Sequence, residues 1–331
     1  MRKRSELPRS LDRDGFTLAD ARAAGVSPKR TRAQDLAIPF RGVRASAGIA
    51  GETSTLARAY AARMPAGQFF SHSTAAQLLG IPLPQRSTRD VALHVSAVTP
   101  DRAPRMDGVI GHTVSVRPEL WIVDGLATTS PVTTWCDLAV TLDLDDLIAA
   151  GDYLLGSLRP PATLIELSSA VTDRFGNRGT QRLRKALLWV RPRVESRQET
   201  RLRLLLLRAG FPEPETNVYL PLRPGRKRVR GDLVYEKYRV LIEYDGEQHR
   251  TDDTQYARDL ERLDDVMADG WRVIRVLKDT PKPEILARLD EALRSRGWRP
   301  DYVVDRLATS RPLAAGEAAP TGNSAQAGQL R

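Results

Sequence analysis

The sequence has a single cysteine, no long apolar run and no leader-like N-terminus, and each absence narrows the choice of protein class. Cys136 is the only cysteine among 331 residues, which excludes an internal disulfide framework and a cysteine-rich zinc site. No apolar run approaches the length of a membrane-spanning helix. The charged N-terminus is not followed by an apolar stretch, so we see no secretory signal. These absences predict a cytoplasmic protein without a membrane partner.

The chain does contain enough apolar sequence for a folded protein and an excess of positive charge. Hydrophobic residues make up 41% of the chain, which is typical of a globular protein, and the length allows two or three domains. The formal net charge of +10 at pH 7 favours polyanionic partners, nucleic acid first among them. A GC-rich genome can also produce an arginine-rich composition, so the charge by itself supports DNA as a partner only modestly.

The most informative stretch consists of two short segments, 230–235 and 239–249. Both are rich in β-branched and aromatic residues and are bounded by polar residues or glycine, which predicts two strands. A tight connection at 236–237 would make them a hairpin. With a two-residue turn, Asp232 lies opposite Leu241, and directly opposed residues share a face of the sheet.

This pairing predicts that Asp232, Glu243 and Asp245 share one face of the hairpin. Buried carboxylates are normally paired, protonated or bound to a cation, and ligands with oxygen donors suit a hard ion such as Mg²⁺. The alternative is that these residues simply form the solvated side of the hairpin. We favour the metal site because apolar residues 240–242 precede the acidic residues and Gly246 follows them.

A helix expected at 196–210 carries a further acidic candidate, Glu199. The apolar stripe of this helix is formed by Leu202, Leu205, Leu206 and Ala209. Glu199 lies one turn before the stripe and three residues after Ser196. Two interpretations stay open. Glu199 completes a capping box with Ser196, or it reaches the acidic face of the hairpin.

The first 46 residues have the outline of a winged helix-turn-helix module. The first helix is expected to begin after its cap Thr17 and to end at Gly25. A second helix begins at Ser27, and a strand is expected at 39–44. The second helix carries Lys29, Arg30 and Arg32. In a winged helix-turn-helix this helix enters the major groove, so these basic residues are candidate DNA contacts. A small helical cap on the next domain fits the pattern equally well.

Residues 52–190 predict a mixed α/β domain whose role the sequence leaves open. Helices are expected at 71–79, 133–142 and 144–155, and strands at 91–96 and 109–116. The region contains His72, His94 and His112, which lack the spacing of metal ligands on one helix or one hairpin. We therefore interpret them as structural histidines. Cys136, beside Trp135, is expected to be a small core residue.

A third domain is expected from residue 192 to residue 306. Behind the hairpin, helices are expected at 256–268 and 283–296, and a strand at 271–277. A strand, a helix and a strand in this order predict a right-handed crossover and a parallel neighbour in the sheet. Asp259 and Arg262 lie one turn apart on the crossover helix and can interact. Residues 307–331 have the composition of a disordered tail.

The order of these features resembles the PD-(D/E)xK nuclease superfamily. The resemblance is carried by Glu199, Asp232, the run 243–249, the pair Asp259 and Arg262, and the run 270–276. Over residues 239–277 the chain is similar to the very-short-patch repair endonucleases and to a large uncharacterised bacterial family allied to them. The N-terminal module resembles that of abortive-infection-type antitoxins.

This resemblance implies metal-dependent cleavage of a phosphodiester bond. It assigns the ligands of Mg²⁺, for which Mn²⁺ can substitute, to Asp232, Glu243, the carbonyl of Tyr244 and Glu199. The implied catalytic set is Glu199, Asp232, Glu243, Asp245 and His249, and the supporting set is Gln248, Asp259 and Arg262. His249 would act as a general base or steady the scissile phosphate.

The chain departs from the superfamily pattern at one position. The usual motif has lysine where this chain has Asp245, and that lysine normally helps to position the attacking water. The resemblance implies that its role has passed to His249, Gln248, Arg262 or Lys278, since the related repair endonucleases use histidine.

Taken together, the sequence predicts an α/β protein. A winged-helix-like module at 1–46 and a mixed α/β region at 52–190 precede a restriction-endonuclease-like α/β domain at 192–306. The expected function is a Mg²⁺-dependent DNA endonuclease without a small-molecule cofactor. The alternative is a non-catalytic DNA-binding regulator of the antitoxin type that carries a degenerate nuclease fold.

Overall fold

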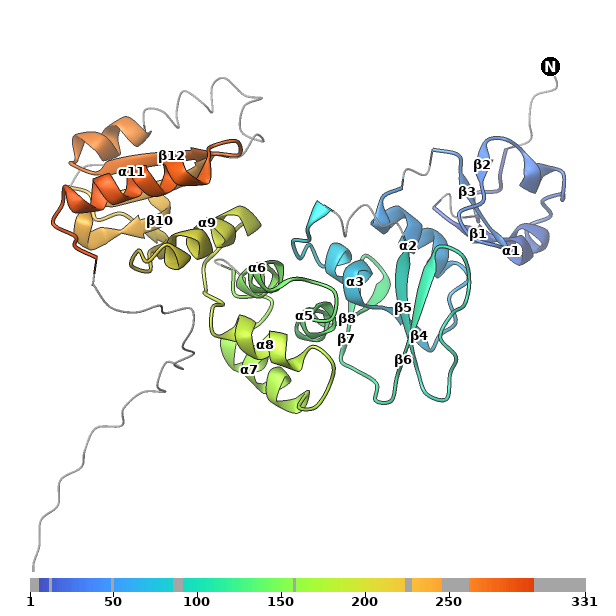
Figure 1. Ribbon diagram of the computed structural model, residues 1–331. Helices are drawn as coiled ribbons and strands as arrows, with labels where there is room; N and C mark the ends of the chain where they lie inside the picture. Colours follow the sequence, from blue (N-terminus) through green and yellow to red (C-terminus); the bar gives the residue numbers. More distant parts are fainter. Residues whose placement is uncertain are drawn as a thin grey trace, which may run out of the picture. The chain divides into compact units, whose positions relative to one another are not determined.

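The computed structural model describes residues 6–11, 14–48, 51–85, 92–156, 159–223, 228–245 and 262–300 (Figure 1). These residues form three β-sheets with accompanying helices, so the protein is α/β, as the sequence predicts. The tail expected at 307–331 lies outside them. In the described residues, no helix is both long enough and apolar enough to cross a membrane.

The N-terminal module is built around a three-stranded sheet in the order β1-β3-β2. Its elements are β1 Phe16–Thr17, α1 Leu18–Ala23, the 3₁₀ helix η1 Arg30–Arg32, β2 Leu36–Ala37 and β3 Val43–Ser46. Thr17 caps α1 as expected. Its hydroxyl accepts from the Asp20 N–H at 3.0 Å, and the Asp20 carboxylate accepts from the Thr17 N–H at 2.9 Å. Gly25, with φ +73°, follows the helix end.

The second helix expected in this module is only the three-residue 3₁₀ helix η1. Its backbone bonds span three residues, as from the Arg32 N–H to the Lys29 carbonyl at 3.3 Å, and Ala33 then turns extended with ψ 149°. Arg30 forms an ion pair with Asp35 at 2.8 Å, whereas Lys29 and Arg32 are exposed. A short turn therefore stands where a longer recognition helix was expected.

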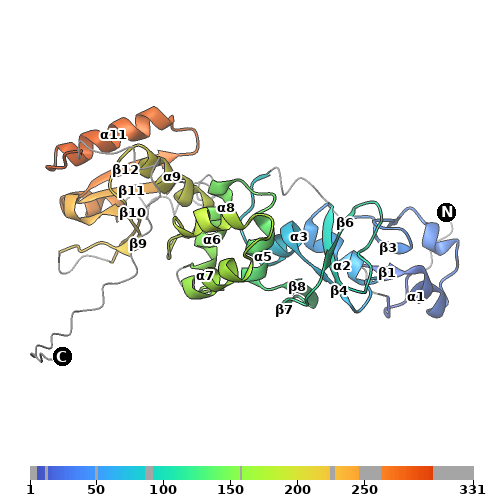
Figure 2. The ribbon, with the colours of Figure 1, turned by 60° about the horizontal axis from the view of Figure 1, so that its bottom comes forward.

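The middle region combines a five-stranded sheet with helices. The sheet has the order β6-β5-β4-β8-β7, and Figure 2 shows β4, β6, β7 and β8 of this sheet beside helices α2 and α3. Its strands are β4 Gln68–Phe70, β5 Leu93–Val98, β6 Val109–Val114, β7 Leu120–Val123 and β8 Leu126–Thr129. The helices are α2 Thr53–Ala61, α3 His72–Leu78, α5 Pro131–Leu138, α6 Leu144–Leu154, α7 Leu164–Asp173 and α8 Thr180–Leu187.

A helical core surrounds Trp135 in α5. The Trp135 ring is fully buried, and its Nε1–H donates to the Leu147 carbonyl at 2.9 Å, which satisfies the indole inside the core. A Cβ on Gly151 of α6 would lie 3.1 Å from Trp135 Nε1 and 2.6 Å from Val190, so a larger residue would separate the helices. Cys136 is buried in the same cluster, in agreement with the sequence-based expectation.

The C-terminal region is a four-stranded sheet in the order β12-β11-β10-β9 with helices on both faces. Its elements are α9 Arg197–Arg208, β9 Glu215–Tyr219, β10 Arg230–Tyr235, the 3₁₀ helix η2 Glu236–Tyr238, β11 Val240–Asp245, helical residues 262–268, β12 Arg272–Leu277 and α11 Lys282–Arg294. Strands β9, β10 and β11 are antiparallel, and β11 and β12 are parallel. The expected hairpin and the expected parallel neighbour are both present.

The register of the hairpin differs from the expected one by one pair. The turn contains η2 and then Arg239, which has φ +49°, so four residues connect the strands in place of two. Leu233 pairs with Ile242, and this register continued by one residue places Asp232 opposite Glu243, not opposite Leu241. Because the turn grew by two residues, each side chain keeps its expected face.

The two faces of this sheet bury different helices. One face contributes Leu233, Val240 and Ile242 to a core shared with α9 and α11. The opposite face contributes Val234 and Leu241 to a core with Val266, which belongs to helical residues 262–268. By alternation, Asp232 and Glu243 belong to this second face. The carboxylates therefore lie on a covered face and not on the solvated side of the hairpin.

Candidate active site

Three carboxylates from separate elements of the C-terminal region gather beside this sheet. Glu199 lies in the first turn of α9, Asp232 on β10 and Glu243 on β11. The Asp232 charge raises the pKa of Glu199, and the Glu243 charge raises that of Asp232, in each case in addition to burial. Alternation along the strands predicted from the sequence that Asp232 and Glu243 share a face. The position of Glu199 on its helix gave one of the two interpretations for that residue, that it reaches this acidic face.

Glu199 makes one half of the capping box and directs its carboxylate elsewhere. The Glu199 N–H donates to Ser196 Oγ at 3.1 Å, which caps α9. Its Oε2 accepts from the Asn217 side-chain amide at 2.6 Å and from the Glu195 N–H at 3.1 Å. Burial first, and then the Asp232 charge, raise the pKa of Glu199 to about 7.

Asp232 is held by the backbone of the neighbouring strand. Its Oδ2 accepts from the Tyr244 N–H at 2.8 Å. Burial and then the charge of Glu243 raise the pKa of Asp232 to about 7, against the opposing effect of that hydrogen bond. Tyr244 thus contributes its N–H to the site, and the role expected for its carbonyl stays a prediction.

Glu243 pairs with a cation on one oxygen and has a buried second oxygen. Its Oε2 lies 3.3 Å from the Arg262 guanidinium, whose other nitrogen donates to the Arg230 carbonyl at 3.3 Å. Its Oε1 is buried and has no hydrogen-bond partner among the described residues. Burial raises the pKa of Glu243 although Arg262 lowers it. A buried carboxylate oxygen without a hydrogen bond is costly unless it binds a cation or a water molecule.

Asp245, the fourth acidic candidate, is engaged differently. It forms an ion pair with Arg275 on β12 and stands at the end of β11. Its charge is therefore compensated by a partner outside the cluster of Glu199, Asp232 and Glu243. Candidates His249, Gln248 and Asp259 lie outside the described residues.

The donors available at this site suit a hard divalent cation. Glu199, Asp232 and Glu243 offer oxygen ligands, which Mg²⁺ prefers, and the unpaired Glu243 Oε1 is a natural ligand atom. The oxygen atoms of the three carboxylates do not yet lie close enough to one another to share one ion. Among the described residues, the group whose ligand atoms all lie within 4.8 Å of one another is a set of histidines elsewhere. Binding a cation here therefore requires rotation of the glutamate side chains.

A basic cleft that the sequence did not reveal lies beside Tyr244. Its volume is about 570 Å³, and it is lined by residues of α9, the end of β12 and the start of α11. The basic residues of its wall are Arg197, Arg201, Arg208, Lys278 and Lys282. The three arginines repeat at helical spacing along one face of α9, which is the signal in the sequence that could have indicated the cleft. Arg197 and Arg208 also pair with Asp146 and Asp145.

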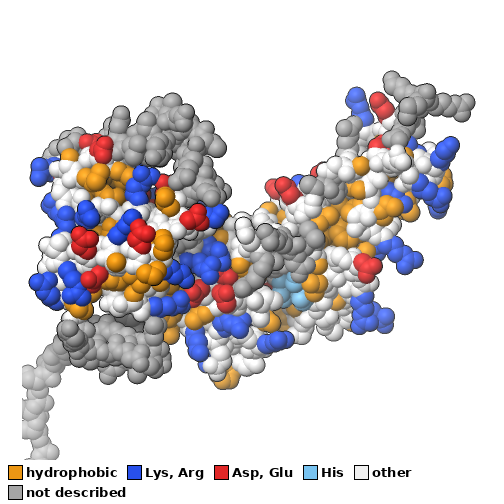
Figure 3. Space-filling model, turned by 45° about the horizontal axis from the view of Figure 1, so that its top comes forward, with side chains coloured by type: hydrophobic (Ala, Val, Ile, Leu, Met, Phe, Trp, Pro, Cys, Tyr) orange, Lys and Arg blue, Asp and Glu red, His pale blue; other side chains and the backbone are white. Residues whose placement is uncertain are grey.

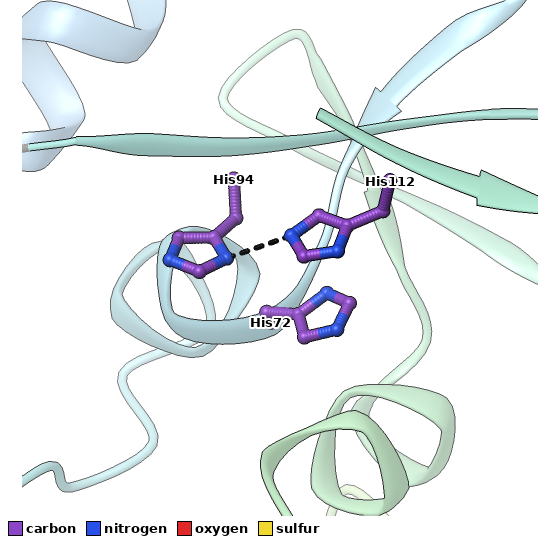
Figure 4. A group of neighbouring side chains, drawn as sticks. All are labelled: His72, His94 and His112. Carbon is purple, nitrogen blue, oxygen red and sulfur yellow. Dashed lines mark hydrogen bonds between the residues drawn. The ribbon is translucent and has the colours of Figure 1, made fainter. Parts of the chain in front are cut away.

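Sequence-based reasoning also missed a cluster formed by His72, His94 and His112. They belong to α3, β5 and β6 and lie together in the middle region (Figure 4). Spacing along the chain could not reveal the cluster, because the pairing of β5 with β6 is what aligns two of them.

The comparisons with known proteins assign no function to this geometry. The chain is 28% identical over 214 residues to uncharacterised proteins from two strains of Mycobacterium tuberculosis, a match covering 64% of this chain and 74% of each relative. No family model and no solved structure matches.

Proposed function

We propose that the C-terminal region binds Mg²⁺ at Glu199, Asp232 and Glu243 and hydrolyses phosphodiester bonds in DNA. The observation that carries this proposal is the buried Oε1 of Glu243, which has no hydrogen-bond partner among the described residues, in a cluster of one buried and two half-buried carboxylates whose pKa values are raised. Such a cluster is unfavourable by itself at neutral pH, and a divalent cation would compensate it. Perturbed carboxylates grouped in this way are more frequent at functional sites than elsewhere.

The protein's own groups would position the carboxylates for this chemistry. The Asn217 amide holds Glu199, and the Tyr244 N–H holds Asp232. Arg262, 3.3 Å from Glu243, takes the position of a cationic group at the site in the absence of the superfamily lysine. A bound divalent cation would supply polarisation of the phosphoryl oxygen and activation of the attacking water.

The substrate class follows from charge. The chain carries a net charge of +10, and the cleft beside Tyr244, on the α9 and α11 face of the sheet, is lined by arginines of α9, by Lys278 and by Lys282, together with Asp145 and apolar side chains. Lysine and arginine in a groove bind the phosphate backbone of nucleic acid independently of its sequence. This supports a polynucleotide as substrate, and we propose DNA.

The test uses the full chain and separates metal binding from cleavage. Mg²⁺ and Mn²⁺ binding is measured by calorimetry, and cleavage of supercoiled and linear DNA is followed in the same buffers. We expect Asp232→Asn with Glu243→Gln to abolish both. Asp290→Asn is the matched control, because Asp290 is an exposed carboxylate that pairs with Arg294 on the same helix, and it is expected to change neither.

The outcomes distinguish a nuclease from a DNA-binding regulator. Cleavage that survives in the folded double variant would overturn the proposal. Salt-dependent DNA binding without any requirement for metal, in a protein that cleaves nothing, would instead support the non-catalytic regulator. In that case the carboxylates would have no role in DNA binding, and the double variant would bind as the wild type does.

A further inference from the structure

Three of the chain's four histidines converge on one face of the five-stranded sheet. His94 of β5 and His112 of β6 lie on parallel neighbouring strands, where His94 pairs with Ile110 and Ser96 with His112. These four residues consequently share a face. His72 is the first residue of α3, and the preceding Ser71 N–H donates to the His94 carbonyl at 3.1 Å, which places the helix start over that face.

The imidazole rings of the three histidines contact one another, His94 and His112 through ring nitrogens and His72 by stacking on them. His94 Nδ1 lies 2.9 Å from His112 Nε2, and the rings of His72 and His112 stack with centroids 3.8 Å apart (Figure 4). One ligand atom from each residue lies within 4.8 Å of the others. Two metal-bound imidazole nitrogens in a tetrahedral site stand about 3.3 Å apart, as follows from zinc–nitrogen bonds of about 2.0–2.1 Å. Binding one ion requires the stacked ring of His72 to turn, so that its nitrogen and those of His94 and His112 point to the same place.

We propose that His72, His94 and His112 bind a first-row transition metal ion, with Zn²⁺ as the natural occupant. Neutral imidazole is a preferred ligand of zinc, whereas Mg²⁺ prefers oxygen. Three protein ligands leave a fourth coordination position for a water molecule or an external ligand. The site is separate from the carboxylate cluster and does not rest on the proposed nuclease activity.

Ser71, Asp137 and Arg174 lie near His72 and can orient its ring. His72 Nδ1 lies 3.0 Å from Ser71 Oγ, which can accept its N–H, and the Asp137 carboxylate lies farther away, at 4.0 Å. That orientation leaves Nε2 of His72 for the metal. Asp137 is itself held by Arg174 at 2.9 Å. A carboxylate or hydroxyl that receives the distal N–H of a metal-bound histidine fixes the ring and its tautomer.

Two further features favour a site over a chance grouping of rings. His72 has φ +50°, in the left-handed region that a non-glycine residue adopts at a cost of about 1–3 kcal/mol, and such strain clusters at functional sites. Histidine side chains of this cluster are visible at the molecular surface, which gives an ion access (Figure 3).

The test uses the full chain purified without a metal-affinity tag. After treatment with a chelator, it is titrated with Co²⁺ in the presence of excess Mg²⁺, which occupies oxygen sites. We expect one Co²⁺ per chain with the visible absorption of a tetrahedral nitrogen site, and displacement by one equivalent of Zn²⁺. The melting temperature of the wild type should rise on addition of Zn²⁺, a readout that needs no variant.

Variants locate the ion. His94→Gln and His112→Gln should each weaken Co²⁺ binding at least 100-fold, whereas His249→Gln, at the remaining histidine, and Asp232→Asn should leave it unchanged. A wild type that binds no Co²⁺ would overturn the proposal, and so would binding that Asp232→Asn removes and the two histidine variants retain. If a histidine variant is unfolded by circular dichroism, the Zn²⁺-dependent melting shift of the wild type decides, and its absence counts against the site.

Discussion

Glu199 at the start of α9 lies so close to Asp232 on β10 that burial and the Asp232 charge together raise the Glu199 pKa to about 7. The pKa of Asp232 is raised to about the same value, first by burial and then by Glu243. Glu199 thus interacts with Asp232 from helix to strand, and Asp232 interacts with Glu243 from strand to strand. Three carboxylates that are well separated along the chain therefore titrate as one electrostatic unit. The first prediction concerns the pH dependence that this unit produces.

Without a divalent cation, the protein should lose stability as the pH rises from 5 to 8. Unfolded carboxyl groups titrate near pH 4, so between about 4 and 7 the folded state holds more protons than the unfolded state, and the free energy of unfolding falls with rising pH. The loss should be on the order of a few kcal/mol. Urea denaturation in EDTA at several pH values measures it.

The control for this pH dependence is Asp232→Asn, which removes one of the three carboxylates with a raised pKa. The variant should show a shallower loss than the wild type and should be the more stable of the two at pH 8. Mg²⁺ should stabilise the wild type more at pH 8 than at pH 5, because ionised carboxylates bind it better. An unfolding free energy for the variant that tracks the wild type at every pH would contradict the assignment.

The buried ion pair between Arg203 and Asp152 should be a major contributor to the stability of the helical core. Asp152 accepts from Arg203 at 2.9 Å, from Thr200 at 2.8 Å and from the Arg191 N–H at 2.6 Å, and neither charged side chain is exposed. Arg203→Met leaves Asp152 buried without its cation, and we expect a loss of about 3–5 kcal/mol in denaturant unfolding.

The matched control for that pair is the exposed pair of Glu284 and Arg288 on α11. Arg288→Met should cost less than about 1 kcal/mol, because solvent screens a surface pair one helical turn apart. Equal losses for Arg203→Met and Arg288→Met would show that burial does not set the contribution of the first pair.

The thiol of Cys136 should be inert in the native protein. It is 1% exposed, and burial raises its pKa to about 12, so almost no thiolate exists at pH 8. A chromogenic disulfide reagent should therefore react with no thiol in native buffer and with one thiol per chain in denaturant. Rapid stoichiometric reaction without denaturant would mean that the core around Trp135 opens readily.

Lys29 and Arg32 should supply phosphate contacts if the N-terminal module binds DNA, and Arg30 should not. The first two are exposed, whereas Arg30 is held by Asp35 at 2.8 Å. Lys29→Ala combined with Arg32→Ala should lower the slope of log affinity against log salt by about 2. Binding measured by fluorescence anisotropy over a series of salt concentrations tests this. A slope that changes only with Arg30→Ala would contradict the assignment.

Local patterns in the sequence were sufficient to predict many of the elements. The cap at Thr17, the hairpin around residue 236, the helix that carries Glu199 and the burial of Cys136 are all present. Caps and strand alternation depend on neighbours within a few residues, so they can be read without knowing the fold. For the same reason Asp232 and Glu243 were placed on one face although the register was wrong by one pair.

Tertiary structure decided the rest, because those features depend on contacts between distant segments. The longer turn set Asp232 opposite Glu243, and Arg262 and Arg275 emerged as partners of the acidic residues. The parallel pairing of β5 with β6 brought the histidines together, a convergence that spacing along the chain cannot encode. The sequence by itself thus determined which residues share a face, and only the tertiary structure decided which faces meet.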